Sequence, residues 1–179
     1  MKVIIVGGGL AGLSTCIALR KYLPRNAGES EHDIRVYEKY THYRNDNQGA
    51  ALGLQGNGLK VLRDLDPALH DRTYGAGNPC RHFTWMAAGG IRLGRSYLSV
   101  LPISRPILLD CLRKSLPDEA VTHKGVSEVV ARQGMKPVVR FADGSPDETA
   151  DLVVGADGVG SPVRHDLFGY DARYHAKYE

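Results

Sequence analysis

The first forty residues constrain the fold more than any other part of this sequence. A short apolar run at Lys2–Val6 is typical of a buried parallel strand, and Leu10–Tyr22 carries apolar residues at helical intervals. A second alternating strand is predicted at Asp33–Glu38. Between the first strand and the helix, three glycines follow the G-x-G-x-x-G spacing: Gly7, Gly9 and Gly12. The order strand, glycine turn, helix, strand predicts a Rossmann-like α/β fold with a central parallel sheet.

Each glycine has its own physical role in such a turn. Gly7 allows the tight turn out of the strand, Gly9 lets a pyrophosphate approach bare backbone, and Gly12 lets the helix lie close to the strand. The helix N-terminus offers free N–H groups and partial positive charge. Glu38 ends the second strand where a ribose hydroxyl needs an acceptor. We therefore predict dinucleotide binding; the alternative is a βαβ unit that binds nothing.

Composition narrows the class of protein. A chain of 179 residues is long enough for one domain with a sizeable core, and its net charge of +3 is not concentrated in any Lys/Arg block. These features argue against nucleic-acid binding. No apolar run reaches the ~18 residues of a membrane span, and Gly7–Gly9 interrupts the first one. We expect a soluble, cytoplasmic protein with no membrane partner.

The cysteines and histidines show no pattern that binds a metal. Cys16, Cys80 and Cys111 are odd in number and far apart, which favours reduced thiols over disulfides or a zinc site. The seven histidines form no short paired motif, so no metal is predicted.

Small residues at Gly49–Ala51 allow a close backbone approach, either at a strand–helix junction or at a ligand, and the sequence leaves both open. Asn57 is predicted to cap a helix that ends before Pro67. Three strands are predicted next, at residues 81–87, 91–94 and 97–103, the first two joined through Gly89–Gly90.

A further helix is expected to begin after Ser104 as N-cap, with Ile107, Leu108, Leu112 and Leu116 on its apolar face. Arg105 lies at the end of this helix that the dipole makes unfavourable for a cation. It either contacts an anionic ligand or is solvated, and its position alone does not decide.

The last third of the sequence predicts a β meander, with strands at residues 121–123, 126–131, 138–141 and 148–154, that returns the chain to the parallel sheet. Ser161 as N-cap and Pro162 at the first helical position then predict a helix. Asp157 is expected to be exposed in the preceding turn, at the edge where open α/β sheets bind ligands.

Three stretches together resemble the FAD-dependent monooxygenases of the para-hydroxybenzoate and salicylate hydroxylase type. They are residues 6–13 with Tyr37-Glu38-Lys39, the segment around Arg105, and Asp151-Leu-Val-Val-Gly-Ala-Asp-Gly-Val-Gly-Ser-Pro-Val-Arg. The third stretch is similar to the family's Asp-Gly motif over about fourteen consecutive residues. The resemblance as a whole covers essentially all of residues 1–179.

By position, the resemblance implies a set of FAD-binding residues. Gly7, Gly9 and Gly12 would bind the pyrophosphate, and Glu38 the adenosine ribose, with Lys39 of the same stretch also binding cofactor. Ala51 would offer its backbone to the flavin side. Arg105 is implied to contact FAD. Asp157 is implied to help bind the pyrophosphates of both FAD and NAD(P)H. No catalytic residue is assigned.

The implied activity is NAD(P)H- and O₂-dependent hydroxylation of an aromatic or phenolic small molecule. Residues 1–179 would be the FAD-binding domain, with residues 80–103 starting a substrate-domain sheet. The sequence is incomplete relative to the family, since members are about twice this length and the Gly-Asp-Ala-Ala-His stretch that follows the Asp-Gly motif is missing.

This departure leaves two explanations, a fragment of a longer enzyme or a naturally short protein. Competing functions are an NAD(P)-dependent dehydrogenase and a non-catalytic nucleotide-binding module, the latter used for cofactor sequestration or as the partner of a separately encoded second half. The substrate and the choice between NADH and NADPH are not specified.

Overall fold

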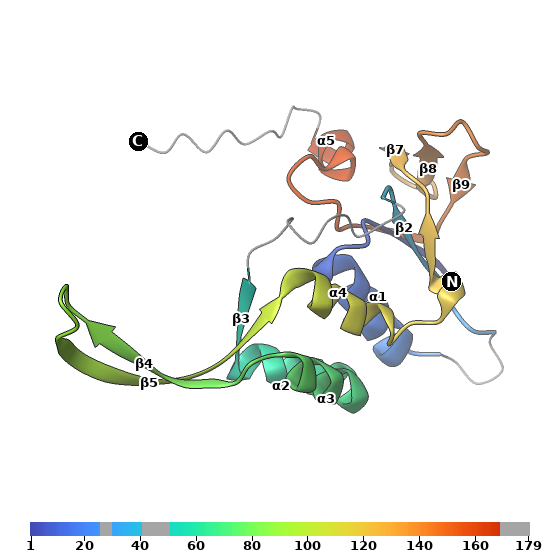
Figure 1. Cartoon of the computed structure of the whole chain (residues 1–179). Coiled ribbons are helices and arrows are strands. Elements are labelled where there is room, and N and C mark those ends of the chain that lie inside the picture. Colours follow the sequence, from blue (N-terminus) through green and yellow to red (C-terminus); the bar gives the residue numbers. More distant parts are fainter. Residues whose placement is uncertain (26–29, 41–50, 169–179) are drawn as a thin grey trace. The chain divides into compact units, whose positions relative to one another are not determined.

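A computed structural model of the chain describes residues 1–25, 30–40 and 51–168, which fall into two compact units (Figure 1). Unit 1 combines both ends of the chain, residues 1–44 and 116–179. Unit 2 is the continuous segment 45–115. Gly49 and Ala50, part of a predicted close backbone approach, lie outside the described residues.

Unit 1 is built on a four-stranded parallel sheet in the order β10-β1-β2-β6. Its strands are β1 (Lys2–Val6), β2 (Asp33–Glu38), β6 (Val121–His123) and β10 (Leu152–Gly155). Helix α1 (Leu10–Tyr22) connects β1 to β2 and packs along both. The predicted α/β fold, and the bounds of β1, α1 and β2, are confirmed. β6 was expected in the meander, but it joins the parallel sheet beside β2.

A second sheet of unit 1 is antiparallel, in the order β7-β8-β9. It comprises β7 (Val126–Val130), β8 (Val138–Phe141) and β9 (Glu148–Thr149). Side chains from both sheets and from α5 (Pro162–Phe168) share one buried core: Ile4, Val6, Tyr37, Val129, Val139, Phe141, Ala150 and Val163. Because successive side chains on a strand face opposite sides, Val3 and Ile5 of β1 face away from this core.

The prediction of one strand over residues 148–154 was wrong. Two short strands lie there, β9 and β10, and they belong to different sheets. The chain changes partners at two consecutive residues, where the N–H of Ala150 donates to Pro137 O and that of Asp151 to Lys2 O. A continuous β-like sequence therefore contains a switch between sheets that depends on distant partners.

Unit 2 holds a three-stranded antiparallel sheet in the order β3-β5-β4 and three helices. The strands are β3 (Ala51–Gln55), β4 (Cys80–Met86) and β5 (Arg92–Ser104); the helices are α2 (Gly56–Leu65), α3 (Pro67–Ala76) and α4 (Arg105–Arg113). A short 3₁₀ turn, η1 (Asp118–Ala120), follows in unit 1. The hairpin through Gly89 and Gly90 is confirmed, and both glycines have φ above +80°.

Three local predictions for unit 2 need correction, and one helix of this unit was not predicted. The two strands predicted at 91–94 and 97–103 are one strand, because Arg95 and Ser96 pair with Thr84 and Phe83. Asn57 is inside α2, which has Gln55 as its N-cap residue, and its side chain accepts from Gly58 N–H. Two further differences concern helices: α3 was not predicted, and Ile107 is exposed instead of buried.

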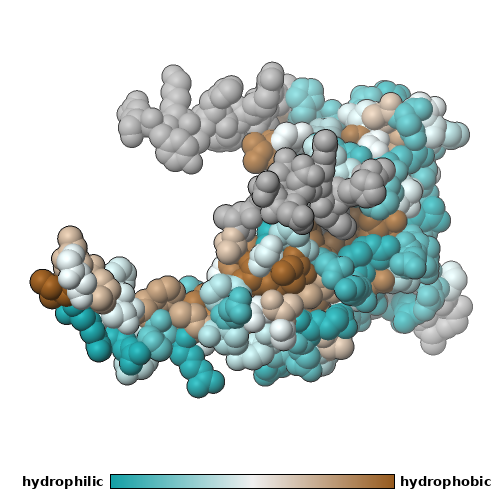
Figure 2. All heavy atoms as spheres, viewed as in Figure 1, coloured by the Kyte–Doolittle hydropathy of each residue, from teal (hydrophilic) through white to brown (hydrophobic). Residues whose placement is uncertain are grey.

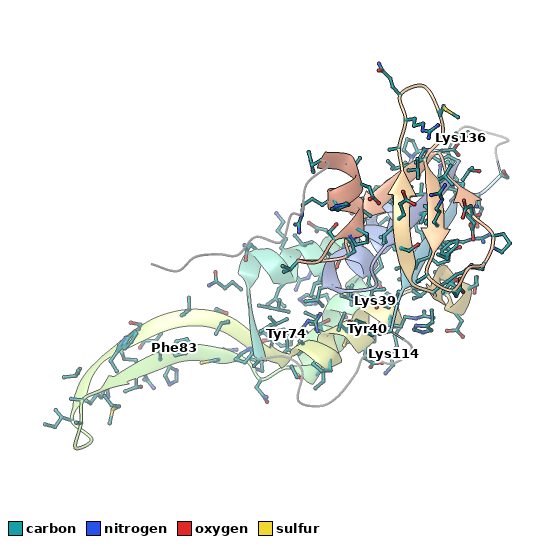
Figure 3. The ribbon with its side chains drawn as sticks, turned by 90° about the horizontal axis from the view of Figure 1, so that it is seen from above. Lys39, Tyr40, Tyr74, Phe83, Lys114 and Lys136 are labelled. Carbon is teal, nitrogen blue, oxygen red and sulfur yellow. The ribbon has the colours of Figure 1, made fainter. Side chains whose placement is uncertain are left out.

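The hairpin of β4 and β5 carries exposed apolar side chains (Figures 2 and 3). They include Phe83, Trp85, Met86, Ile91, Leu93 and Tyr97. The part of the chain that the structure describes holds no helix long and apolar enough to cross a membrane.

Candidate functional site

The carboxyl edge of the parallel sheet in unit 1 gathers three turns from distant parts of the sequence. The turn after β1 contains Gly7–Gly9, the turn after β2 follows Glu38, and the turn after β10 contains Asp157. Ligands of open α/β sheets bind at this edge. The edge therefore brings together the residues for which pyrophosphate and ribose contacts were predicted from the sequence.

Two glycines of the motif, Gly7 in the turn after β1 and Gly12 in α1, leave no room for side chains. Gly7 has φ +104°, and a Cβ there would lie 2.4 Å from Ala156 O. A Cβ on Gly12 would lie 1.9 Å from Gly7 O. Gly7 N–H donates to Tyr37 O at 2.8 Å, which ties the turn to β2. The turn is thus fixed between β2, β10 and α1.

Gly9 is open where Gly7 and Gly12 are crowded. A Cβ built on Gly9 meets nothing within 4 Å. Gly9 is also the N-cap residue of α1, so no side chain at this position can bond the first N–H groups of the helix. This is the bare, electropositive backbone that a diphosphate requires, and the arrangement fits the pyrophosphate of an adenine dinucleotide.

Glu38 is buried and already bonded to the glycine turn. Its Oε2 accepts from Gly8 N–H at 2.6 Å and its Oε1 from Tyr40 N–H at 3.0 Å. A carboxylate offers about four acceptor positions, and these two bonds use two of them. Lys39 is exposed, and its Nζ lies 4.8 Å from the centre of the Tyr40 ring (Figure 3).

Asp157 was expected to be exposed, and it is half-buried. Its Oδ2 accepts from Val163 N–H at 3.2 Å, so the carboxylate lies against the first turn of α5. Gly158 follows with φ +81° and lets the chain turn into that helix. The predicted N-cap is confirmed, since Ser161 Oγ accepts from Arg164 N–H at 2.9 Å.

A network of polar side chains that was not predicted from the sequence joins Tyr37 of β2 to Glu148 and Lys2. Tyr37 OH donates to Glu148 Oε1 at 2.6 Å, and Lys2 Nζ lies 2.8 Å from Glu148 Oε2. Burial, together with the bond to the Glu148 carboxylate, raises the pKa of Tyr37 to about 12. Burial alone would raise the pKa of Glu148, but hydrogen bonds from Lys2 and Tyr37 outweigh it and lower that pKa. The signal in the sequence that could have identified Tyr37 is its position directly before Glu38. Glu148 lies 111 residues away from Tyr37.

In unit 2 the sheet brings together two further predicted residues. Ala51, the first residue of β3, pairs with Ser104, the last residue of β5. Arg105 comes next and is exposed at the start of α4. Ala51 and Arg105 therefore lie at the same end of this sheet, although more than fifty positions separate them. Among the described residues, no group of three or more His, Cys, Asp or Glu side chains is placed to hold a metal ion.

The family model for the FAD binding domain matches residues 1–175. Among curated proteins, the chain is 29% identical to 6-hydroxynicotinate 3-monooxygenase of Pseudomonas fluorescens, over 99% of this chain and 46% of that protein. It is 32% identical to the FAD-dependent urate hydroxylase of Mycolicibacterium vanbaalenii, over 94% of this chain and 42% of that protein. The chain spans less than half the length of these relatives.

Solved structures show the same fold. The tetrameric form of 2-methyl-3-hydroxypyridine-5-carboxylic acid oxygenase is 28% identical with a TM-score of 0.71, over 93% of this chain and 42% of that one. FqzB superposes with a TM-score of 0.76 at 21% identity, over 95% of this chain and 39% of that one.

Proposed function

Because this chain belongs to the FAD-binding domain family, we propose that it binds FAD as the N-terminal part of a flavin monooxygenase. The observation that carries this proposal is the turn after β1. There Gly9 leaves bare backbone at the N-terminus of α1, and Glu38 closes the neighbouring strand. In this proposal, residues 1–179 are the FAD-binding domain and residues 80–103 begin a substrate-domain sheet.

The residues of unit 1 take the adenine side of the cofactor. Gly7 and Gly12 set the shape of the turn, and the N–H groups beside Gly9 bind the pyrophosphate. Glu38 accepts from ribose hydroxyls, with Lys39 exposed beside it. Asp157, whose carboxylate also holds the start of α5, contributes to binding the pyrophosphates of FAD and NAD(P)H.

We also propose cofactor contacts for two residues of unit 2. Ala51 offers backbone to the flavin side, and Arg105 contacts FAD with its guanidinium. Their place at one end of the β3–β5 pair supports this role, since Arg105 is exposed at the unfavourable end of α4 for a cation. A negatively charged ligand at this end of α4 offsets the positive charges of Arg105 and of the helix N-terminus.

For the whole enzyme we propose NAD(P)H- and O₂-dependent hydroxylation of an aromatic or phenolic small molecule. This finer assignment is supported by relatives whose names describe a hydroxynicotinate monooxygenase and an aminohydroxybenzoate monooxygenase. When bound, FAD supplies the redox chemistry, and the protein contributes position, polarity and exclusion of water. A chain limited to residues 1–179 is expected to bind cofactor with weak or no turnover.

The test is titration of the purified protein with FAD, in which binding is followed by the change in the flavin absorbance bands at roughly 370 and 450 nm, bands that nicotinamides lack. Loss of a hydrogen bond to a charged group costs about 1.5–3 kcal/mol. Glu38→Ala and Arg105→Ala should therefore each weaken FAD binding about ten- to a hundredfold. Matched controls on exposed residues, Glu119→Ala and Arg92→Ala, should bind as the parent does. Unchanged affinity in Glu38→Ala would remove the ribose assignment.

A further inference from the structure

Tyr37 connects the antiparallel sheet of unit 1 to the strand that ends in Glu38. Its side chain is 3% exposed, and its ring meets the ring of Phe141 edge-on at 4.9 Å between centres. Its hydroxyl donates to Glu148 Oε1 at 2.6 Å, and Lys2 Nζ holds the other oxygen of the same carboxylate. Contacts from both sheets thus fix the position of this ring.

The backbone of Tyr37 is part of the candidate nucleotide site. Tyr37 O accepts from Gly7 N–H at 2.8 Å, and one residue later Glu38 Oε2 accepts from Gly8 N–H at 2.6 Å. The side chains of Tyr37 and Glu38 face opposite sides of β2, because successive residues of a strand alternate. A rotation of Tyr37 about the strand would therefore displace Glu38 in the opposite sense and shift the glycine turn.

We propose that Tyr37 is a positioning residue for the ribose of the bound adenine nucleotide, held in place by Glu148 and Lys2. This inference rests on the proposed function, in which Glu38 accepts from a ribose hydroxyl. A binding carboxylate must be held within about 0.5 Å of its productive position, and packing and hydrogen bonds behind it provide that precision. The hydroxyl of Tyr37 does this without touching the nucleotide.

The experiment compares the affinities of ADP and 2′-deoxy-ADP by calorimetry. If Glu38 bonds the 2′-hydroxyl, the parent protein should prefer ADP about ten- to a hundredfold. Tyr37→Phe keeps the ring but removes the hydroxyl, so this preference should fall below about threefold. Glu148→Ala, which removes the partner of that hydroxyl, should lower the preference similarly. The double variant should show little further loss of this preference, because both changes remove the same Tyr37–Glu148 hydrogen bond.

A merely structural role predicts a different result. A general loss of stability would lower the melting temperature and weaken ADP and 2′-deoxy-ADP equally, leaving their ratio unchanged. The control Tyr22→Phe alters an exposed tyrosine of α1 and should keep the parental ratio. Folded Tyr37→Phe and Glu148→Ala proteins that retain the full preference would overturn the inference. A parent protein that binds both nucleotides equally would instead refute the ribose role of Glu38, and this inference with it.

Discussion

At the scale of single residues, Gly12 and Gly58 show how the same residue type meets opposite constraints in two helices. A Cβ on Gly12 would collide with Gly7 O at 1.9 Å, an atom of the backbone that cannot rotate away. A Cβ on Gly58 in α2 would meet only a Leu54 methyl group at 3.7 Å, an ordinary contact. The first glycine is required by close packing, whereas the second is replaceable.

We therefore expect Gly12→Ala to destabilise the protein by about 3 kcal/mol or more, because overpacking against backbone forces α1 away from the turn. FAD affinity should fall more than tenfold in any folded fraction. Gly58→Ala should be neutral or stabilise by up to about 1 kcal/mol, the helix preference of alanine over glycine. Urea unfolding of the two variants measures both effects, and equal stabilities would contradict the close packing of Gly12.

The Glu148 carboxylate makes stability depend on pH. Its pKa is lowered in the folded protein, so its contribution is fully present above the unfolded value near 4.5 and is lost as pH falls through the folded value. Glu148→Gln should cost about 1–2 kcal/mol at pH 7. In urea unfolding at pH 7, 5 and 3, the gap between variant and parent should shrink in the acidic samples. A gap that stays constant over this range would argue against the ion pair with Lys2.

At the scale of elements, the structure that depends on local sequence was predicted correctly, whereas the structure that depends on distant partners was not. The bounds of β1, α1 and β2 followed from the glycine spacing and the change of apolar period. Helix α3 was missed because its buried residues, Leu69, His70 and Thr73, form no apolar stripe. The split between β9 and β10 was missed because Asp151 binds Lys2, 149 positions away.

The candidate site divides in the same way. The glycine turn and Glu38 could be located from one continuous stretch, and so could the turn that contains Asp157. The Tyr37–Glu148 contact could not, since nothing local in either segment marks the other. Asp157 was placed in the correct turn, but its contact with α5 depends on how that helix docks.

Two serines at helix starts give a matched test of capping. Ser161 Oγ bonds the N–H of Arg164, whereas Ser104 makes no side-chain cap bond, although each precedes a proline within the first helical turn. Ser161→Ala should therefore cost about 1 kcal/mol and Ser104→Ala only a few tenths. Thermal unfolding of both variants measures the difference, and an equal loss would contradict the caps described.

At the scale of the whole molecule, both units contribute buried apolar side chains. Those of unit 2 include Leu69, Leu101, Leu108 and Leu112, from α3, β5 and α4. Trp85 is the one tryptophan of the sequence, lies on β4 and is 60% exposed. Its fluorescence therefore reports on unit 2, while the proposed ADP-binding residues belong to unit 1.

We expect ADP to stabilise the two units unequally. At a hundred times its dissociation constant, a ligand adds about 2.7 kcal/mol to the unit that binds it. Circular dichroism, which follows both units, should show a transition that ADP moves to higher urea. The Trp85 transition should move less. Identical shifts in both signals would mean that the units unfold as one.

The central place of β1 has a consequence for synthesis on the ribosome. β1 pairs with β2 on one side and with β10 on the other, and β10 is made more than a hundred residues after β2. At 5–20 residues per second, one edge of the nascent β1 stays unpaired for roughly 10 s. An apolar strand with an open edge invites association with other chains. Yield in cells should therefore depend on chaperones that shield β1 as it emerges.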